Sequence, residues 1–230
     1  MIMNKPKQLT FPWNKNTKVT FNNFYIDPKN INLVMDLKDV TINDDFFIYG
    51  VSNSGKTYLQ QSLCNFFQQL DKSSIYIPLN EALKYGVNIL DSIENIDLIC
   101  IDNLELIEKN LEWQIAIFNL INNTVLSNSK LFFTVSKDNG SLNFSMPDLD
   151  SRIKKMQSYE LFEVQENNIS AALQYIAKSR SINLGEAETR YLLKYSTRSI
   201  SYLIKILDKL DNTSMELKRK ITIPLIKEFI

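Results

Sequence analysis

The sequence contains no histidine, only two cysteines and only five glycines. Without histidine, the chain cannot build a histidine-based catalytic triad, a histidine general base or most kinds of zinc site. Cys64 and Cys100 both lie in apolar stretches, so we predict buried free thiols rather than a disulfide. Any chemistry must therefore use carboxylates, lysine, arginine and the groups of a bound ligand.

The sequence also lacks long apolar runs and an excess of charge of either sign. No segment approaches the roughly 18 consecutive apolar residues that a membrane span needs, and no signal peptide opens the chain. Lys+Arg and Asp+Glu number 26 each, so composition indicates no strong attraction to nucleic acid or to anionic membranes. We therefore expect a cytoplasmic protein without a membrane partner. With 44% hydrophobic residues among 230, the chain should bury the core of one medium domain, or of a domain with a small appendage.

Strand signals alternate with helix signals over the first two thirds of the chain. Short apolar segments typical of buried strands occur at 46–49, 75–78, 98–102, 131–135 and 159–162. Helical spacing occurs at 20–43, 56–70 and 111–126, and then at 169–179, 184–195, 200–210 and 223–229. The helix at 111–126 is apolar almost all round, so we expect it to be largely buried. We predict a tail at 1–18, an α/β domain with a doubly wound parallel five-stranded sheet at 19–163, and a small α-helical lid domain at 164–230.

A phosphate-binding motif follows the first predicted strand directly. It has the form GxxxxGK[ST] and consists of Gly50, Val51, Ser52, Asn53, Ser54, Gly55, Lys56 and Thr57. The glycines let backbone N–H groups turn toward phosphate oxygens, the lysine neutralises the β- and γ-phosphates, and the threonine hydroxyl binds Mg²⁺. The following helix points its positive N-terminus at the same anion. Because the strand and helix context fits, we predict a site for ADP or ATP with Mg²⁺ rather than an ordinary loop.

Acidic and amide residues after the third predicted strand bear on the reaction at this site. Asp102 ends that strand, where a carboxylate would hold Mg²⁺ through water; by itself such an aspartate is often a turn residue. Asn103 stands where ATPases of this type usually have the Glu or Asp that polarises the attacking water, so we expect slow hydrolysis. Glu105 is either a substitute acid or a solvated charge, and we favour the solvated charge. The pattern indicates a nucleotide holder rather than a motor.

Over nearly its whole length the chain resembles the DnaA/Hda family of AAA+ proteins, and the regulatory inactivators of that family more closely than its initiators. The resemblance is carried by segments 20–24 (TFNNF), 100–103 (CIDN), 113–120 (WQIAIFNL), 147–152 (PDLDSR), 207–211 (LDKLD) and 221–228 (ITIPLIKE). The initiators add a long N-terminal oligomerisation region and a C-terminal helix-turn-helix domain. This chain has neither pattern, as expected of an inactivator.

The resemblance implies roles for single residues. Arg152 looks like the arginine finger that would reach ATP held by a neighbouring DnaA, the alternative being a surface salt bridge. Ser136 would sense the γ-phosphate position, the alternative being a strand-end cap. The family's nucleotide-contacting lid arginine aligns with Ser201. Arg198, one helical turn earlier, would substitute for it or would be solvated.

The tail carries a short linear motif that consists of Gln8, Leu9, Thr10, Phe11, Pro12 and Trp13. It is similar to the peptide with which replication proteins, including the inactivators, bind the sliding clamp, the β subunit of DNA polymerase III. The Gln8 amide would fix one end, Leu9 and Phe11 would fill apolar pockets, and Pro12 would keep the segment extended. The alternative is a tail that packs on its own domain.

Together these features predict a negative regulator of replication initiation that promotes hydrolysis of DnaA-bound ATP. DNA would be reached mainly through the clamp, which places the protein at the nucleoid, and a homo-oligomer is left open. Three alternatives compete with this hypothesis: an autonomous AAA+ ATPase such as a helicase loader, a scaffolding adaptor on the clamp, and a direct DNA binder. Asn103 and the tail motif argue against the first, and the neutral charge argues against the last.

Overall fold

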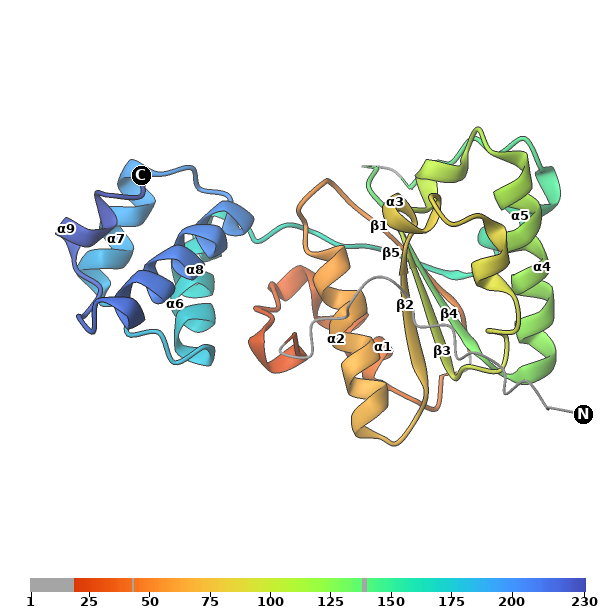
Figure 1. Cartoon of the computed structure of the whole chain (residues 1–230), viewed down its shortest axis with the longest axis horizontal. Coiled ribbons are helices and arrows are strands. Elements are labelled where there is room, and N and C mark those ends of the chain that lie inside the picture. Colours follow the sequence, from red (N-terminus) through yellow and green to blue (C-terminus); the bar gives the residue numbers. More distant parts are fainter. Residues whose placement is uncertain (1–18, 43, 138–139) are drawn as a thin grey trace, which may run out of the picture.

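A computed structural model describes residues 19–42, 44–137 and 140–230. The predicted clamp-binding motif at 8–13 lies outside the described residues. The chain forms an α/β part followed by a group of helices beside it (Figure 1). Two apolar clusters cover the two faces of the sheet, and a third lies within the helical group. None of the helices in the described part of the chain is long and apolar enough to cross a membrane.

The sheet has five parallel strands in the order β2–β3–β4–β1–β5. They are β1 (Phe46–Tyr49), β2 (Ser74–Pro78), β3 (Leu98–Asp102), β4 (Lys130–Val135) and β5 (Gln157–Glu160). The apolar runs in β3 and β4 suit strands that are covered on both faces, and all of β3 is buried. The doubly wound α/β prediction is confirmed. Only the fifth strand is displaced, because the hydrogen-bonded pairing with β1 begins two residues earlier than the apolar signal.

Helices on one face of the sheet are η1 (Phe21–Asn23), η2 (Pro28–Asn30), α1 (Ile31–Lys38) and α2 (Lys56–Gln69). On the other face lie α3 (Leu79–Ala82), η3 (Val87–Leu90), η4 (Leu104–Ile107), α4 (Leu111–Ser127) and α5 (Pro147–Ile153). Within the 20–43 segment, α1 starts after Asp27 and Pro28, because Pro28 holds Asp27 in an extended conformation, and it ends at Lys38, before the last apolar residue of the helical pattern, Val40. The expectation of a largely buried α4 was wrong, since Leu111, Val125 and Leu126 are exposed.

The helical group consists of η5 (Glu166–Asn168), α6 (Ile169–Ser179), α7 (Glu186–Tyr195), α8 (Ile200–Glu216) and α9 (Ile223–Ile226). Leucine and isoleucine recur at helical spacing on the inner faces of α6 and α8 and form its core. Helix α8 extends six residues beyond its predicted end, because no glycine or proline interrupts the polar segment after Leu210. Helix α9 is shorter than predicted.

Asp27 joins the helical group to the α/β part. Its side chain is 1% exposed. One carboxylate oxygen, Oδ2, accepts hydrogen bonds from the Gln165 backbone N–H and the Asn168 side-chain amide, both at 3.0 Å. The other oxygen accepts from the Lys29 backbone N–H at 3.2 Å. Nearby, the Tyr175 hydroxyl donates to the Asn22 carbonyl at 2.8 Å. These contacts hold the helical group beside the end of β1 and thereby close one side of the site.

Candidate nucleotide-binding site

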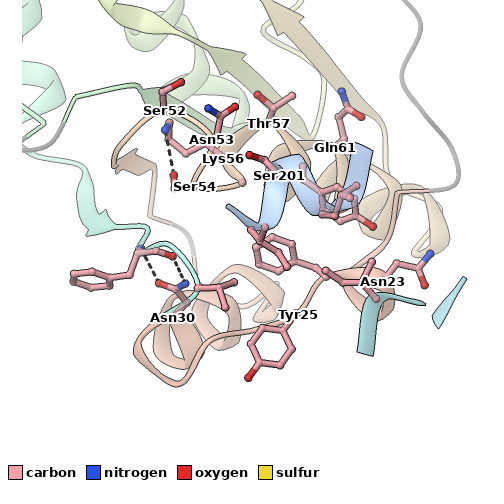
Figure 2. A pocket seen from close by; sticks show the side chains of 18 of the residues that line it. Asn23, Tyr25, Asn30, Ser52, Asn53, Ser54, Lys56, Thr57, Gln61 and Ser201 are labelled. Atoms are coloured by element: carbon pink, nitrogen blue, oxygen red, sulfur yellow. Dashed lines mark hydrogen bonds between the residues drawn. The ribbon is translucent and has the colours of Figure 1, made fainter. Parts of the chain in front are cut away.

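A cavity of about 460 Å³ lies between the loop after β1 and the helical group. Figure 2 shows loop residues on one wall and Ser201 of α8 facing them. Its polar end is lined by Ser52, Asn53, Ser54, Gly55, Lys56, Thr57, Asn103 and Ser136. The remaining lining includes Asn23, Phe24, Tyr25, Asn30, Tyr58, Gln61, Phe162, Val164, Ile176, Arg180, Ile200, Ile204 and Lys205. The cavity therefore joins the predicted phosphate loop to an apolar wall.

Glycine is required at both ends of the phosphate loop. At Gly50, φ is +155° and an added Cβ would lie 2.5 Å from the Leu161 carbonyl oxygen. At Gly55, φ is +105° and an added Cβ would lie 3.0 Å from the Phe24 ring. These close approaches let the chain turn sharply from β1 into α2, so that the N-terminus of this 14-residue helix faces the cavity.

Lys56 is buried and its ammonium group is held by its own loop. It donates to the carbonyl oxygens of Gly50 and Val51 at 2.9 and 2.7 Å. It also donates to the Ser54 hydroxyl at 3.2 Å (Figure 2). Burial lowers the pKa of Lys56, and the charges of nearby carboxylates, Asp102 first among them, oppose that shift. A cation held this way lacks a strong counter-ion, so an anion in the cavity would compensate its desolvation.

Asp102 is held by hydroxyl groups from three elements. Its Oδ2 atom accepts from Thr57 at 2.6 Å and from Tyr76 at 2.9 Å. Its Oδ1 atom accepts from Thr134. Strand β4 lies between β1, which leads into the phosphate loop, and β3, which ends at Asp102. Thr134 of β4 therefore lies next to this acid. A threonine hydroxyl beside a carboxylate provides the oxygen ligands that Mg²⁺ prefers, so these residues fit that ion.

Residues after β3 and β4 meet at the polar end of the cavity. Asn103 and Ser136 both line it. The Ser136 backbone N–H donates to Glu105 Oε2 at 3.2 Å. The expectation that Glu105 is a solvated charge was wrong: its side chain is half-buried, and burial raises the pKa of this carboxyl. Glu105 thus positions the loop that carries Ser136.

The predicted arginines take different places. Arg152 lies on α5, which packs against α4 through buried Leu149 and Ile153, and it does not line the cavity. Arg198 also lies away from the cavity, because its guanidinium pairs with Glu166 at 2.7 Å on the surface. In this structure Arg198 therefore has the solvated position, and its contact with a nucleotide stays a prediction. The helical-turn argument fails because α8 begins only at Ile200, so the two positions do not share a helix face.

The cavity is lined by two cationic residues, Arg180 and Lys205, that the sequence analysis did not predict. Lys205 follows Ser201 by four residues on α8, so helical spacing from Ser201 would have found it. Arg180 follows α6 and pairs with Asp208 at 2.6 Å. No motif marks Arg180, since its position depends on how the helices pack.

The aromatic lining of the cavity was also missed. The rings of Phe24 and Tyr58 stack with centroids 5.5 Å apart. Asn30 is buried, and its side-chain amide exchanges two hydrogen bonds with the Phe162 backbone, at 2.8 and 3.0 Å. Aromatic and aliphatic side chains suit a planar ring, while the loop suits phosphates. Together these residues have the chemistry of a nucleotide site.

Known proteins share this arrangement. The model of the family described as "Hda, lid domain" matches residues 166–230. An uncharacterized protein of Haemophilus influenzae is 30% identical over 229 residues, which cover 97% of this chain and 98% of that protein. Among solved structures, domain III of the Thermotoga maritima replication initiation protein DnaA is similar, with a TM-score of 0.77, 20% identity and coverage of 95% of this chain and 99% of that one. AMPPCP-bound DnaA from Aquifex aeolicus has a TM-score of 0.72 and 20% identity, over 88% of this chain and 68% of that one.

The structural matches show the AAA+ fold, and the family model identifies the helical group as an Hda-type lid. The full-length relative extends the similarity over both parts. The chain belongs to the Hda/DnaA family of AAA+ proteins.

Proposed function

We propose that the chain is a nucleotide-bound negative regulator of replication initiation that is recruited by the DNA-loaded sliding clamp and promotes hydrolysis of DnaA-bound ATP. Membership of the Hda/DnaA family makes it a DnaA-related replication regulator, and the proposal concerns how it acts. One observation carries the proposal: residues 52–57 of the predicted phosphate loop line the cavity, whereas Gly50, Val51, Asp102 and the candidate finger, Arg152, do not.

The cavity is proposed to hold ADP or ATP. Lys56 and the loop backbone would bind the phosphates, and the Phe24–Tyr58 side would contact the base. Thr57 and Asp102 would hold Mg²⁺, which supplies charge neutralisation between the phosphates. The similar Aquifex aeolicus DnaA contains AMPPCP, which supports nucleotide binding here. Asn103 cannot accept a proton from water, so the resident nucleotide would be turned over slowly.

Arg152 is proposed to act on ATP held by DnaA. It stands near the end of α5, and within the described residues it forms no ion pair. A guanidinium group without a partner is available to stabilise charge on a transferring phosphoryl group in a neighbouring molecule. The chain would then contribute a catalytic group to another protein's site, while its own site holds nucleotide for binding and orientation.

The clamp contact rests on the sequence of the tail. Gln8, Leu9 and Phe11 would dock into the clamp, with Pro12 and Trp13 completing the segment. Tethering to a clamp on DNA would raise the local concentration of the chain near newly replicated DNA without direct base contacts.

An autonomous ATPase, for example a helicase loader, is the second candidate function. One observation favours it: Glu105 is half-buried beside Ser136 and Asn103 and could serve as the acid that Asn103 is not. Hydrolysis of ATP by the isolated chain at motor-like rates would support this candidate over the regulator.

The experiment measures loss of labelled ATP already bound to DnaA after the chain is added, with and without clamp loaded on DNA. Arg152→Ala and a Gln8→Ala/Leu9→Ala double variant remove the two proposed contacts. Arg190→Ala, an exposed arginine on α7 outside the cavity, serves as the matched control. We expect clamp-dependent hydrolysis that falls at least about a hundredfold with Arg152→Ala, because an arginine finger contributes about 10³–10⁵ in rate.

The outcomes separate the hypotheses. Loss with both variants and no change with Arg190→Ala would support the regulator. Stimulation that survives Arg152→Ala would indicate a scaffold that brings other factors to the clamp. No stimulation of DnaA under any condition would refute the proposal.

A further inference from the structure

Tyr76 reaches the metal end of the site from an edge strand. It lies in the middle of β2, paired with Cys100 of β3, and its side chain is 9% exposed. Its hydroxyl donates to Asp102 Oδ2 at 2.9 Å. The same oxygen accepts from Thr57 at 2.6 Å, and Thr134 donates to the other oxygen. No sequence motif marks Tyr76 for this position.

Three hydroxyl donors hold Asp102 without a cationic partner. Asp102 is 1% exposed, and a buried carboxylate is costly unless it is hydrogen-bonded. All three donors are neutral hydroxyls, and no lysine or arginine in the described part of the chain forms an ion pair with Asp102.

Thr57 can serve Asp102 and a metal at once. In this structure its hydroxyl donates to Oδ2. In the proposed nucleotide complex, the Thr57 oxygen would be a ligand of Mg²⁺ through a lone pair, while its proton would stay on Asp102. Thr57 would thus have two tasks, whereas the hydroxyls of Tyr76 and Thr134 hold Asp102 alone.

We infer that Tyr76 is a positioning residue: its hydroxyl holds the Asp102 carboxylate in place beside Thr57, and this sets how strongly nucleotide binding depends on Mg²⁺. The inference rests on the proposed nucleotide binding. It concerns a residue of this chain that touches Asp102 and not the nucleotide.

Gln61 is a further hydrogen-bond partner of Tyr76. Gln61 lies on α2 beyond Thr57 and lines the cavity (Figure 2). Tyr76 thus contacts both a residue of the cavity wall and the acid.

The test compares ADP dissociation constants in Mg²⁺ and in EDTA by calorimetry. The measured quantity is the dissociation constant in EDTA divided by the dissociation constant in Mg²⁺. This ratio is determined for the wild type, Tyr76→Phe and Tyr159→Phe. Tyr159 is the matched control, because its hydroxyl also donates to a carboxylate, Asp36, but it does not line the cavity. We expect the ratio to fall about tenfold in Tyr76→Phe, the size of one hydrogen bond to a charged group, and to stay unchanged in Tyr159→Phe.

A double-mutant cycle separates positioning from general destabilisation. Asp102→Asn should lower the ratio by itself, and Tyr76→Phe added to it should lower it no further, because Tyr76 acts through Asp102. A further loss of the same tenfold size on the Asp102→Asn background would overturn the inference.

A measurement on the wild type covers the case in which Tyr76→Phe does not fold. The Tyr76 hydroxyl proton, followed by NMR, should remain protected from exchange when ADP and Mg²⁺ are added. Its loss of protection, or an equal Mg²⁺ dependence in wild type and Tyr76→Phe, would overturn the inference alone. Absence of nucleotide binding by the wild type would overturn both the inference and the proposed function.

Discussion

Replacement of Asp27 by asparagine should loosen the lid. In the wild type, Asp27 Oδ2 accepts from Gln165 and Asn168 of the lid, and Oδ1 accepts from Lys29. An asparagine has one acceptor oxygen and one amide donor, so in either orientation the amide N–H₂ faces backbone or side-chain donors. Asp27→Asn therefore loses one or two hydrogen bonds to a charged group. We expect a cost of about 2–4 kcal/mol, since each such bond contributes about 1.5–3 kcal/mol.

The pH dependence of this effect has a defined sign. Burial by itself would raise the pKa of Asp27, but hydrogen bonds from Asn168, Gln165 and Lys29 outweigh it, so the pKa lies below its ordinary value. A lowered pKa contributes stability that is present above the unfolded-state pKa of about 3.9 and is lost as pH falls through the folded-state pKa. The difference in unfolding free energy between wild type and Asp27→Asn should thus be constant at neutral pH and shrink below about pH 4.

Hydrogen exchange of the lid amides is the assay. If the lid joint opens locally, amides near 165–168 should exchange about 30- to 1,000-fold faster in Asp27→Asn, the equivalent of about 2–4 kcal/mol. Asp97→Asn is the matched control: that carboxylate also accepts from a backbone N–H and a side chain, both of Ser73, but it lies in the α/β part. Equal exchange rates at the lid in wild type and Asp27→Asn would refute the reasoning.

Two further pairs of variants test the site. Gly50→Ala should destabilise the protein in urea by at least about 1–3 kcal/mol more than Gly86→Ala, because its Cβ would meet the Leu161 carbonyl, whereas at Gly86 nothing lies within 4 Å. Equal losses would contradict this. Arg198→Ala should leave ADP affinity unchanged, since its ion pair is exposed, whereas Lys205→Ala should weaken ADP binding about two- to fivefold in calorimetry. A larger loss of ADP affinity in Arg198→Ala than in Lys205→Ala would instead indicate that Arg198 contacts the nucleotide.

Local signals made the sheet and the phosphate loop predictable. Each strand is a short apolar run, and the loop's glycines and lysine have a fixed spacing between a strand and a helix. Asp102 was found because it ends such a run. In each case the residues that specify the structure are neighbours in the sequence, so no knowledge of packing was required.

Contacts between distant residues were not predictable. Asp27 and Gln165 are 138 residues apart, and no pattern indicates that they meet. Glu105 was predicted to be a solvated charge, yet the fold places the Ser136 amide beside it. The hydroxyls of Tyr76 and Thr134 lie within apolar strands, and only the strand order brings both to Asp102. Such residues are specified by tertiary packing rather than by local sequence.

Under the proposed function, the same residues that weaken this chain as an ATPase suit it as a partner. Asn103 lines its own cavity and cannot accept a proton from water, so nucleotide there would persist and keep the lid engaged with the loop. Arg152 stands outside that cavity on the α4–α5 side of the sheet, where it cannot stabilise phosphates bound by its own loop. A site that hydrolyses its nucleotide slowly, combined with an arginine outside the cavity, is the arrangement expected when hydrolysis occurs in a neighbouring molecule. Restoring the acid with Asn103→Glu should then raise hydrolysis by the isolated chain and shorten the lifetime of its ATP-bound form, without requiring any change at Arg152.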